Sequence, residues 1–149
     1  WQYTPKVFTN LALDYIRKAT QEEKPFALVL SWNPPHDPWK KENTDPHCYE
    51  RFKDTQFELP PNFIEKPDPY MDRFPQEFFA GDSIWRKDFI EGGGYQEMMR
   101  SYYAMVNSID EQFGRVTALV DSLGIANNTI IVFTSDHGRC LPPKDECIN

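Results

Sequence analysis

The sequence predicts an α/β fold in which parallel strands are flanked by helices. Two observations lead to this prediction: a helix-patterned stretch runs directly into a strand-like apolar segment, and a longer amphipathic stretch precedes a second such segment. Strand, crossover helix and strand make a βαβ unit, whose strands are parallel and end at one edge of the sheet. We therefore expect a site where these two apolar segments end.

Length and composition favour one ordered domain. The chain has 149 residues, of which 40% are hydrophobic and 15% aromatic, and this composition argues against disorder. The net charge is −7 and the basic residues are scattered, so no nucleic-acid footprint is expected. No apolar stretch approaches the roughly 18 residues of a membrane helix. Residues 1–20 lack a signal-peptide core, so we expect either a cytoplasmic chain or a missing N-terminus.

A first helix is predicted over residues 5–22. Thr4 is a candidate N-cap and Pro5 suits the first helical position. Apolar residues recur at helical spacing, namely Val7, Phe8, Leu11, Ala12, Tyr15, Ile16 and Ala19. Pro25 blocks continuation, and residues 26–32 are apolar enough for a strand covered on both faces.

The periodicity disappears from residue 33 to about residue 94. Nine of the thirteen prolines fall in this segment, between Pro34 and Pro75, mixed with aromatic residues. Loops longer than roughly 15 residues are usually functional or disordered, and the aromatic content favours an ordered, irregular excursion packed on the domain. Aromatic side chains that could wall a carbohydrate site are Phe57, Phe63, Tyr70, Phe78, Phe79 and Trp85.

The clearest predicted element is a long helix from residue 95 to about residue 123. Apolar residues hold one face of it over about eight turns, and Gly124 stands where a left-handed C-cap belongs. After a turn, residues 129–134 are β-branched and apolar, which predicts the second strand.

Asp136 and His137 follow the second predicted strand directly. A carboxylate beside an imidazole at a strand end can ligate one cation, and Gly138 permits a sharp turn of the backbone. The alternative is that Asp136 caps a turn and His137 is a surface residue. Of the other metal-type residues, Cys48, Cys140 and Cys147 form no metal-binding pair, and their disulfide pairing is left open.

His36 follows the first predicted strand, among three prolines at positions 34, 35 and 38. Proline restricts its own φ and the conformation of the preceding residue, so the imidazole would be presented with little conformational freedom. This presentation suits a proton donor or a contact to an anion. The alternative is a histidine packed on Trp32 or Trp39.

Two stretches together resemble the sulfatase family of the alkaline phosphatase superfamily: "KPFALVLSWNPPHDPW" and "YYAMVNSIDEQFGRVTALVDSLGIANNTIIVFTSDHG". The resemblance covers about residues 4–39 and 95–138. It implies a partial alkaline-phosphatase-like sheet and a substrate-variable excursion over residues 40–94. It also implies that Asp136 and His137 ligate a divalent cation, usually Ca²⁺, with Zn²⁺ or Mn²⁺ as alternatives. His36 would be both catalytic and substrate-binding.

By this resemblance residues 1–149 are part of one sulfatase catalytic domain, with a tail over residues 139–149. The parent would hydrolyse a sulfate ester on a sugar or aryl alcohol, and the family suggests an extracytoplasmic location, whether secreted, periplasmic or lysosomal. The family's formylglycine motif of the "C-x-P-S-R" type and its early aspartate pair are absent. "CLPPK" (140–144) does not replace that motif, because it follows Asp136 and lacks the Ser and Arg.

No nucleophile is therefore assigned in this sequence. We expect the chain to need the remainder of the catalytic domain and to be inactive as a sulfatase by itself. Two alternatives stay open: a phosphodiesterase or phosphonate hydrolase of the same superfamily, and a non-catalytic binding module.

Overall fold

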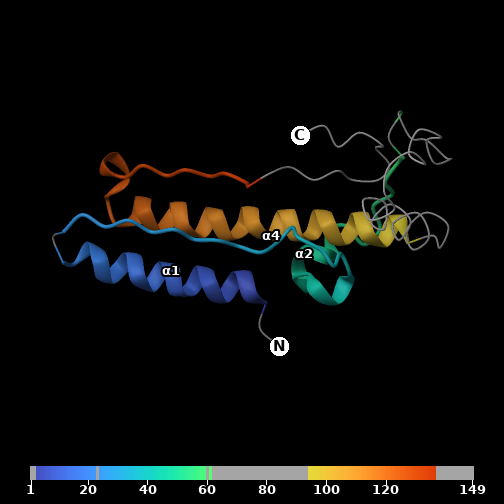
Figure 1. The fold of residues 1–149 in the computed structure, drawn as a ribbon, viewed down its shortest axis with the longest axis horizontal. Coiled ribbons are helices and arrows are strands. Elements are labelled where there is room, and N and C mark those ends of the chain that lie inside the picture. Colours follow the sequence, from blue (N-terminus) through green and yellow to red (C-terminus); the bar gives the residue numbers. More distant parts are fainter. Residues whose placement is uncertain (1–2, 23, 60, 62–93, 137–149) are drawn as a thin grey trace, which may run out of the picture. The chain divides into compact units, whose positions relative to one another are not determined.

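A computed structural model of the protein describes residues 3–22, 24–59, 61 and 94–136 (Figure 1). Its elements, in chain order, are α1 (Thr4–Thr20), η1 (Lys41–Asn43), α2 (Pro46–Glu50), α4 (Tyr95–Ser122) and η5 (Ala126–Asn128). The chain divides into two compact units, of which the first combines Trp1–Thr55 with Glu97–Val132 and the second combines Gln56–Gln96 with Phe133–Asn149.

Helix α1 confirms the first predicted helix. Tyr3, in an extended conformation, is the N-cap, whereas the predicted cap Thr4 is the first helical residue. Pro5 lies in the first turn, where its missing N–H has no intrahelical partner to lose. Of the predicted apolar face, Ala12, Ile16 and Ala19 are buried, and Leu13, which was not predicted, joins them in the core. Phe8, Leu11 and Tyr15 are exposed, so the prediction is wrong for these three residues.

Helix α4 and its C-terminal cap are also as predicted. Gly124 adopts a φ of 70°, the left-handed region that favours glycine. Its N–H donates to the Asp121 carbonyl at 3.0 Å, and the Ile125 N–H donates to the Val120 carbonyl at 3.3 Å. These two bonds form a Schellman cap, which satisfies carbonyls that the last turn of the helix leaves open.

Helix α2 falls within the segment predicted to be irregular. Its N-cap is Asp45, whose side chain accepts a hydrogen bond from the His47 N–H at 3.0 Å, and Pro46 lies in the first turn. The prediction of an irregular segment is therefore wrong for α2, where the Asp-Pro pair is a local helix-start signal. Residues 62–93, the larger part of the excursion, lie outside the described residues.

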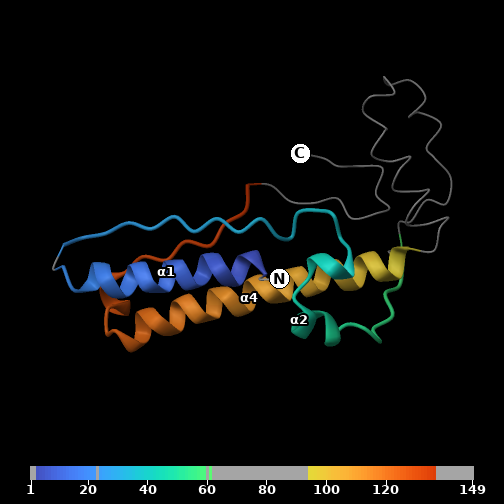
Figure 2. The ribbon, with the colours of Figure 1, turned by 90° about the horizontal axis from the view of Figure 1, so that it is seen from below.

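In the first unit, α1 lies alongside α4 and runs in the same direction (Figures 1 and 2). Arg115 Nη2 donates to Asn10 Oδ1 at 2.6 Å, which joins the two helices. Lys6 of α1 forms an ion pair with Asp45 at the start of α2. Helix α2 in turn packs on α4 through a cluster of Cys48, Tyr49 and Ala104, with Phe52 at its margin.

The predicted α/β fold with a parallel sheet is wrong for the described part of the chain, which is helical. Residues 26–32 and 129–134 are extended, but neither segment is a strand of a sheet. Val29 and Ile130 are each 93% exposed, whereas a strand inside a parallel sheet is covered on both faces. Strand pairing requires a neighbouring backbone distant in the sequence, and the described residues provide none for these two segments.

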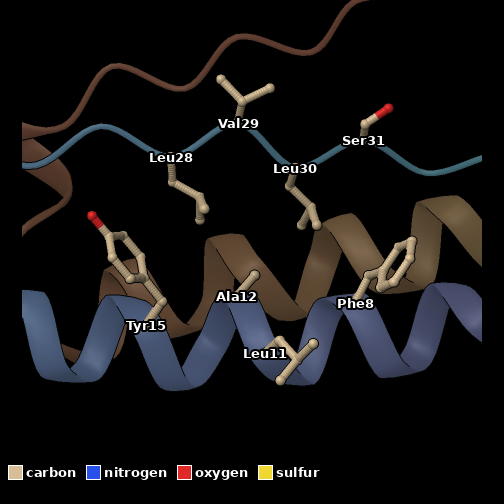
Figure 3. Close-up of a pocket in the computed structure, with 8 residues that line it drawn as sticks. All are labelled: Phe8, Leu11, Ala12, Tyr15, Leu28, Val29, Leu30 and Ser31. Carbon is tan, nitrogen blue, oxygen red and sulfur yellow. The ribbon is translucent and has the colours of Figure 1, made fainter.

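The first extended segment instead lies on α1. Leu28 and Leu30 point toward the helix, and Val29 and Ser31 point away from it (Figure 3). Two contacts fix its ends: the Phe26 ring meets the Tyr15 ring edge-on at 5.9 Å, and Trp32 Nε1 donates to Thr9 Oγ1 at 3.2 Å. The segment and the helix enclose an apolar groove of about 420 Å³, lined by Phe8, Leu11, Ala12, Tyr15, Leu28, Val29, Leu30 and Ser31.

Within the described residues, no helix combines the length and apolar character that crossing a bilayer requires.

Candidate functional site

His36 lies in a loop of residues 33–40 between the first extended segment and η1; we call it the His36 loop. The His36 side chain is 70% exposed. Its Nδ1 lies 2.9 Å from the main-chain carbonyl oxygen of Asp37 and 2.8 Å from Asp37 Oδ1. Most of the imidazole is therefore open to solvent.

Beneath the exposed imidazole, the His36 loop is attached to the helices. Trp39 is 3% exposed, and its Nε1 donates to the Pro35 carbonyl at 2.6 Å. The Trp39 ring also meets the ring of Tyr102 on α4 edge-on, with centroids 5.9 Å apart. On the other side of His36, Asn43 Nδ2 donates to the Pro38 carbonyl at 3.1 Å. The backbone on both sides of His36 is thus held while its ring faces solvent.

The predicted metal ligands are only partly described. Asp136 is exposed, and Ser135 Oγ lies 3.5 Å from its Oδ1. His137 lies outside the described residues, as do Cys140 and Cys147. His36 belongs to the first unit and Asp136 to the second, so their meeting in one pocket stays a prediction.

A divalent cation site is not assembled by the described residues. Among them, no group of three or more His, Cys, Asp or Glu side chains is arranged to hold a metal ion. The Asp136 carboxylate is the hard oxygen ligand that Ca²⁺ prefers, but Ca²⁺ takes six to eight oxygen ligands and one carboxylate does not make a site.

A polar network between α2 and α4 was missed by the sequence analysis. Glu111 on α4 forms an ion pair with Arg51, in which Glu111 Oε1 lies 2.9 Å from Arg51 Nη2. The other carboxylate oxygen, Oε2, lies 3.6 Å from Cys48 Sγ. His47 Nε2 is 3.8 Å from the same carboxylate. No local signal could have found this network, because Cys48 and Glu111 are 63 positions apart.

This network argues against Cys48 as a nucleophile. Its side chain is fully buried, and burial, followed by the nearby Glu111 carboxylate, raises the pKa of the thiol from 9.0 to about 12. The thiolate is the reactive form of cysteine, and a thiol with this pKa stays protonated at neutral pH. Cys48 is therefore a core residue of the α2–α4 contact.

The model of the sulfatase family matches residues 1–145. The chain belongs to the sulfatase family. The resemblance predicted from the two sequence stretches is thereby confirmed.

Similar proteins support this membership. The sulfatase chain is 31% identical to the multifunctional alkaline phosphatase superfamily protein PehA of Trinickia caryophylli, over 90% of this chain and 27% of PehA. It is 28% identical to the ulvan-active sulfatase of Formosa agariphila, over 97% of this chain and 23% of that protein. It is 31% identical to human (Homo sapiens) iduronate 2-sulfatase, over 95% of this chain and 26% of that protein. No solved structure matches.

The chain spans about a quarter of the length of these curated relatives.

Proposed function

We propose that this sulfatase chain is part of a metal-dependent hydrolase that cleaves a sulfate ester of a sugar or an aryl alcohol. The observation that carries the proposal is the family match over residues 1–145, which includes the His36 loop. His36 is the residue we assign to the ester: an exposed imidazole on an anchored backbone can meet a ligand without first being ordered.

His36 has two roles in this proposal, binding the sulfate and assisting departure of the alcohol. As the S–O bond breaks, its electron pair stays on the alcohol oxygen, and a proton from the protonated imidazole forms the new O–H bond. The sulfuryl group passes to an oxygen nucleophile, which we assign to no residue of this chain. Cys48 is unsuited to that role because its thiol stays protonated.

The proposed cation ligands are Asp136 and His137. A carboxylate oxygen suits Ca²⁺, which we propose first, whereas the imidazole keeps Zn²⁺ and Mn²⁺ as alternatives. When bound, the cation polarises the sulfate oxygens. Two ligands bind such an ion weakly, so we expect the rest of the catalytic domain to complete the site.

The relatives of this chain include an ulvan-active sulfatase and an iduronate 2-sulfatase. These names favour a sulfated carbohydrate. The proposal assigns no nucleic-acid partner, and an extracytoplasmic location stays an inference from the family.

A pair of substitutions in the whole protein tests the assignment of His36. With an aryl sulfate as substrate, His36→Ala should lower kcat by roughly 10²- to 10⁴-fold, the usual contribution of general acid catalysis. His47→Ala removes the imidazole in the α2–α4 network and should leave the rate within a few-fold of the unsubstituted protein. Equal effects of the two substitutions on kcat would show that His36 takes no part in the reaction.

Two other functions are tested by the same protein. The first alternative is a phosphodiesterase or phosphonate hydrolase of the alkaline phosphatase superfamily, to which the relative PehA belongs. Such an enzyme would turn over a diaryl phosphate or an aryl phosphonate ester faster than the aryl sulfate. A non-catalytic module would show no dependence of its unfolding temperature on Ca²⁺, Mn²⁺ or Zn²⁺, and Asp136→Ala would change nothing in that titration.

A further inference from the structure

The contacts of His36 Nδ1 determine which ring nitrogen carries the proton. Nδ1 faces two oxygens of Asp37, the main-chain carbonyl at 2.9 Å and Oδ1 at 2.8 Å. A carbonyl and a carboxylate oxygen are both acceptors, so Nδ1 must be the donor in either contact. The hydrogen bond made by one imidazole nitrogen selects the tautomer and leaves the other nitrogen for the ligand.

We propose that Asp37 is a positioning residue, which holds His36 in the Nδ1–H form and leaves Nε2 as the atom that meets the ester. The role of Nε2 rests on the proposed function, because its ligand is the sulfate ester proposed above. The orientation itself rests on the contacts of Asp37.

Asp37 can hold the ring because the backbone that carries both residues is fixed. The Pro35 carbonyl is bound by the buried Trp39 at 2.6 Å, and the Pro38 carbonyl is bound by Asn43 at 3.1 Å. The His36 N–H also donates to the Asn33 carbonyl at 3.1 Å. These bonds leave rotation of the two side chains as the main freedom of the pair, and the 2.8 Å contact restricts it.

The tautomer has a direct consequence for the proposed proton transfer. When Nε2 has given its proton to the departing alcohol, the neutral ring already has its remaining proton on Nδ1, where Asp37 accepts it. The ring therefore does not have to turn or exchange protons before Nε2 is protonated again. Without the Asp37 carboxylate, Nδ1 keeps only the main-chain carbonyl of residue 37 as an acceptor, so the share of the Nε2–H form should rise.

The test is a measurement of tautomers by two-bond ¹H–¹⁵N correlation spectra of the 149-residue chain, at a pH where the imidazoles are neutral. His36→Gln identifies the His36 signals among those of the three histidines. In the unsubstituted chain we expect a protonated Nδ1 and a bare Nε2. Asp37→Ala should lower the ratio of Nδ1–H to Nε2–H by roughly two- to fivefold, the range for an exposed charged contact.

Asp14→Ala is the matched control, because Asp14 is an exposed carboxylate on α1 that pairs with Arg17. It should leave the His36 tautomer unchanged, and His47 serves as an internal reference in every spectrum. An Nε2–H ring in the unsubstituted chain, or an unchanged ratio in Asp37→Ala, would overturn the proposal.

This measurement is independent of turnover. If the whole protein hydrolyses no sulfate ester while Asp37→Ala still shifts the tautomer, the proposed function fails and the positioning role stands. If turnover depends on His36 but the tautomer does not depend on Asp37, only the positioning role fails.

Discussion

The helical region and the extended segments both carry large apolar side chains, but place them in opposite environments. In the helical region, Met98 and Ala104 of α4 are fully buried. In the extended segments, Val29 and Ile130 are each 93% exposed. The difference teaches that apolar sequence alone does not place a side chain in a core.

The physical cause is where the backbone finds its hydrogen bonds. A helix satisfies most of its N–H and C=O groups within itself, so α1 and α4 need only one apolar face each to pack. An extended segment must find another backbone, and side chains on its second face need a second covering layer. The following predictions test this contrast, from the largest expected effect to the smallest.

The largest contrast is expected between Met98→Ala and Val29→Ala. Met98→Ala opens a cavity in the packed face of α4 and should lower the free energy of unfolding by about 2–5 kcal/mol. Val29→Ala removes methyl groups already in water and should change it by less than about 0.5 kcal/mol. Urea denaturation measures both. Similar losses would mean that the extended segment is covered in solution, and the comparison would fail.

Asp45→Ala tests how much the helical region depends on polar contacts. Asp45 is buried, caps α2 and pairs with Lys6 of α1, so we expect a loss of roughly 1–2 kcal/mol in the free energy of unfolding. The control is Asp14→Ala, which removes an exposed pair on the surface of α1 and should have an effect near zero. An equally small effect of Asp45→Ala would show that α2 packs without its cap.

A pair of glycine substitutions probes the junction between α4 and the second extended segment. Neither Gly114 nor Gly124 has an atom within 4 Å of an added Cβ, so only the backbone conformation separates them. Gly124→Ala should destabilise the chain by about 1–2 kcal/mol, because its φ is 70°. Gly114→Ala, inside the helix, should stabilise it by about 0.5–1 kcal/mol. Thermal unfolding of both variants measures these changes in stability. Changes of the same sign in both variants would contradict the Schellman cap.

The smallest effect at neutral pH concerns the Cys48 thiol within the helical region. Because folding raises its pKa from 9.0 to about 12, the buried thiol holds its proton in the folded state after the unfolded chain has lost it. The buried, protonated thiol therefore makes its full contribution to the free energy of unfolding below pH 9.0. This contribution is lost as the pH rises toward about 12. Alkylation by iodoacetamide, followed by mass spectrometry of the Cys48 peptide, should be slow below pH 9.0 in the folded chain.

Urea-unfolded chain is the reference for this measurement. It should alkylate at Cys48 as an ordinary thiol does at the same pH. Equal rates in the folded and unfolded chain would show that the α2–α4 contact opens readily.

For the fold, the sequence by itself determined the elements whose signals are local. Pro5 and the apolar periodicity marked α1, and the long apolar face with Gly124 marked α4 and its cap, because these features act within a few turns of one helix. The sequence also carried the two stretches that identify the sulfatase family.

Only the tertiary structure decided the rest. It left residues 26–32 and 129–134 extended without pairing in the described part of the chain, since pairing depends on backbone that the local pattern cannot specify. It also brought Glu111 to Cys48 and Arg51, and Tyr102 of α4 to Trp39, through packing of segments distant in sequence. The imidazole was visible in the sequence, but its contact with Asp37 depends on a loop conformation that the helices hold in place.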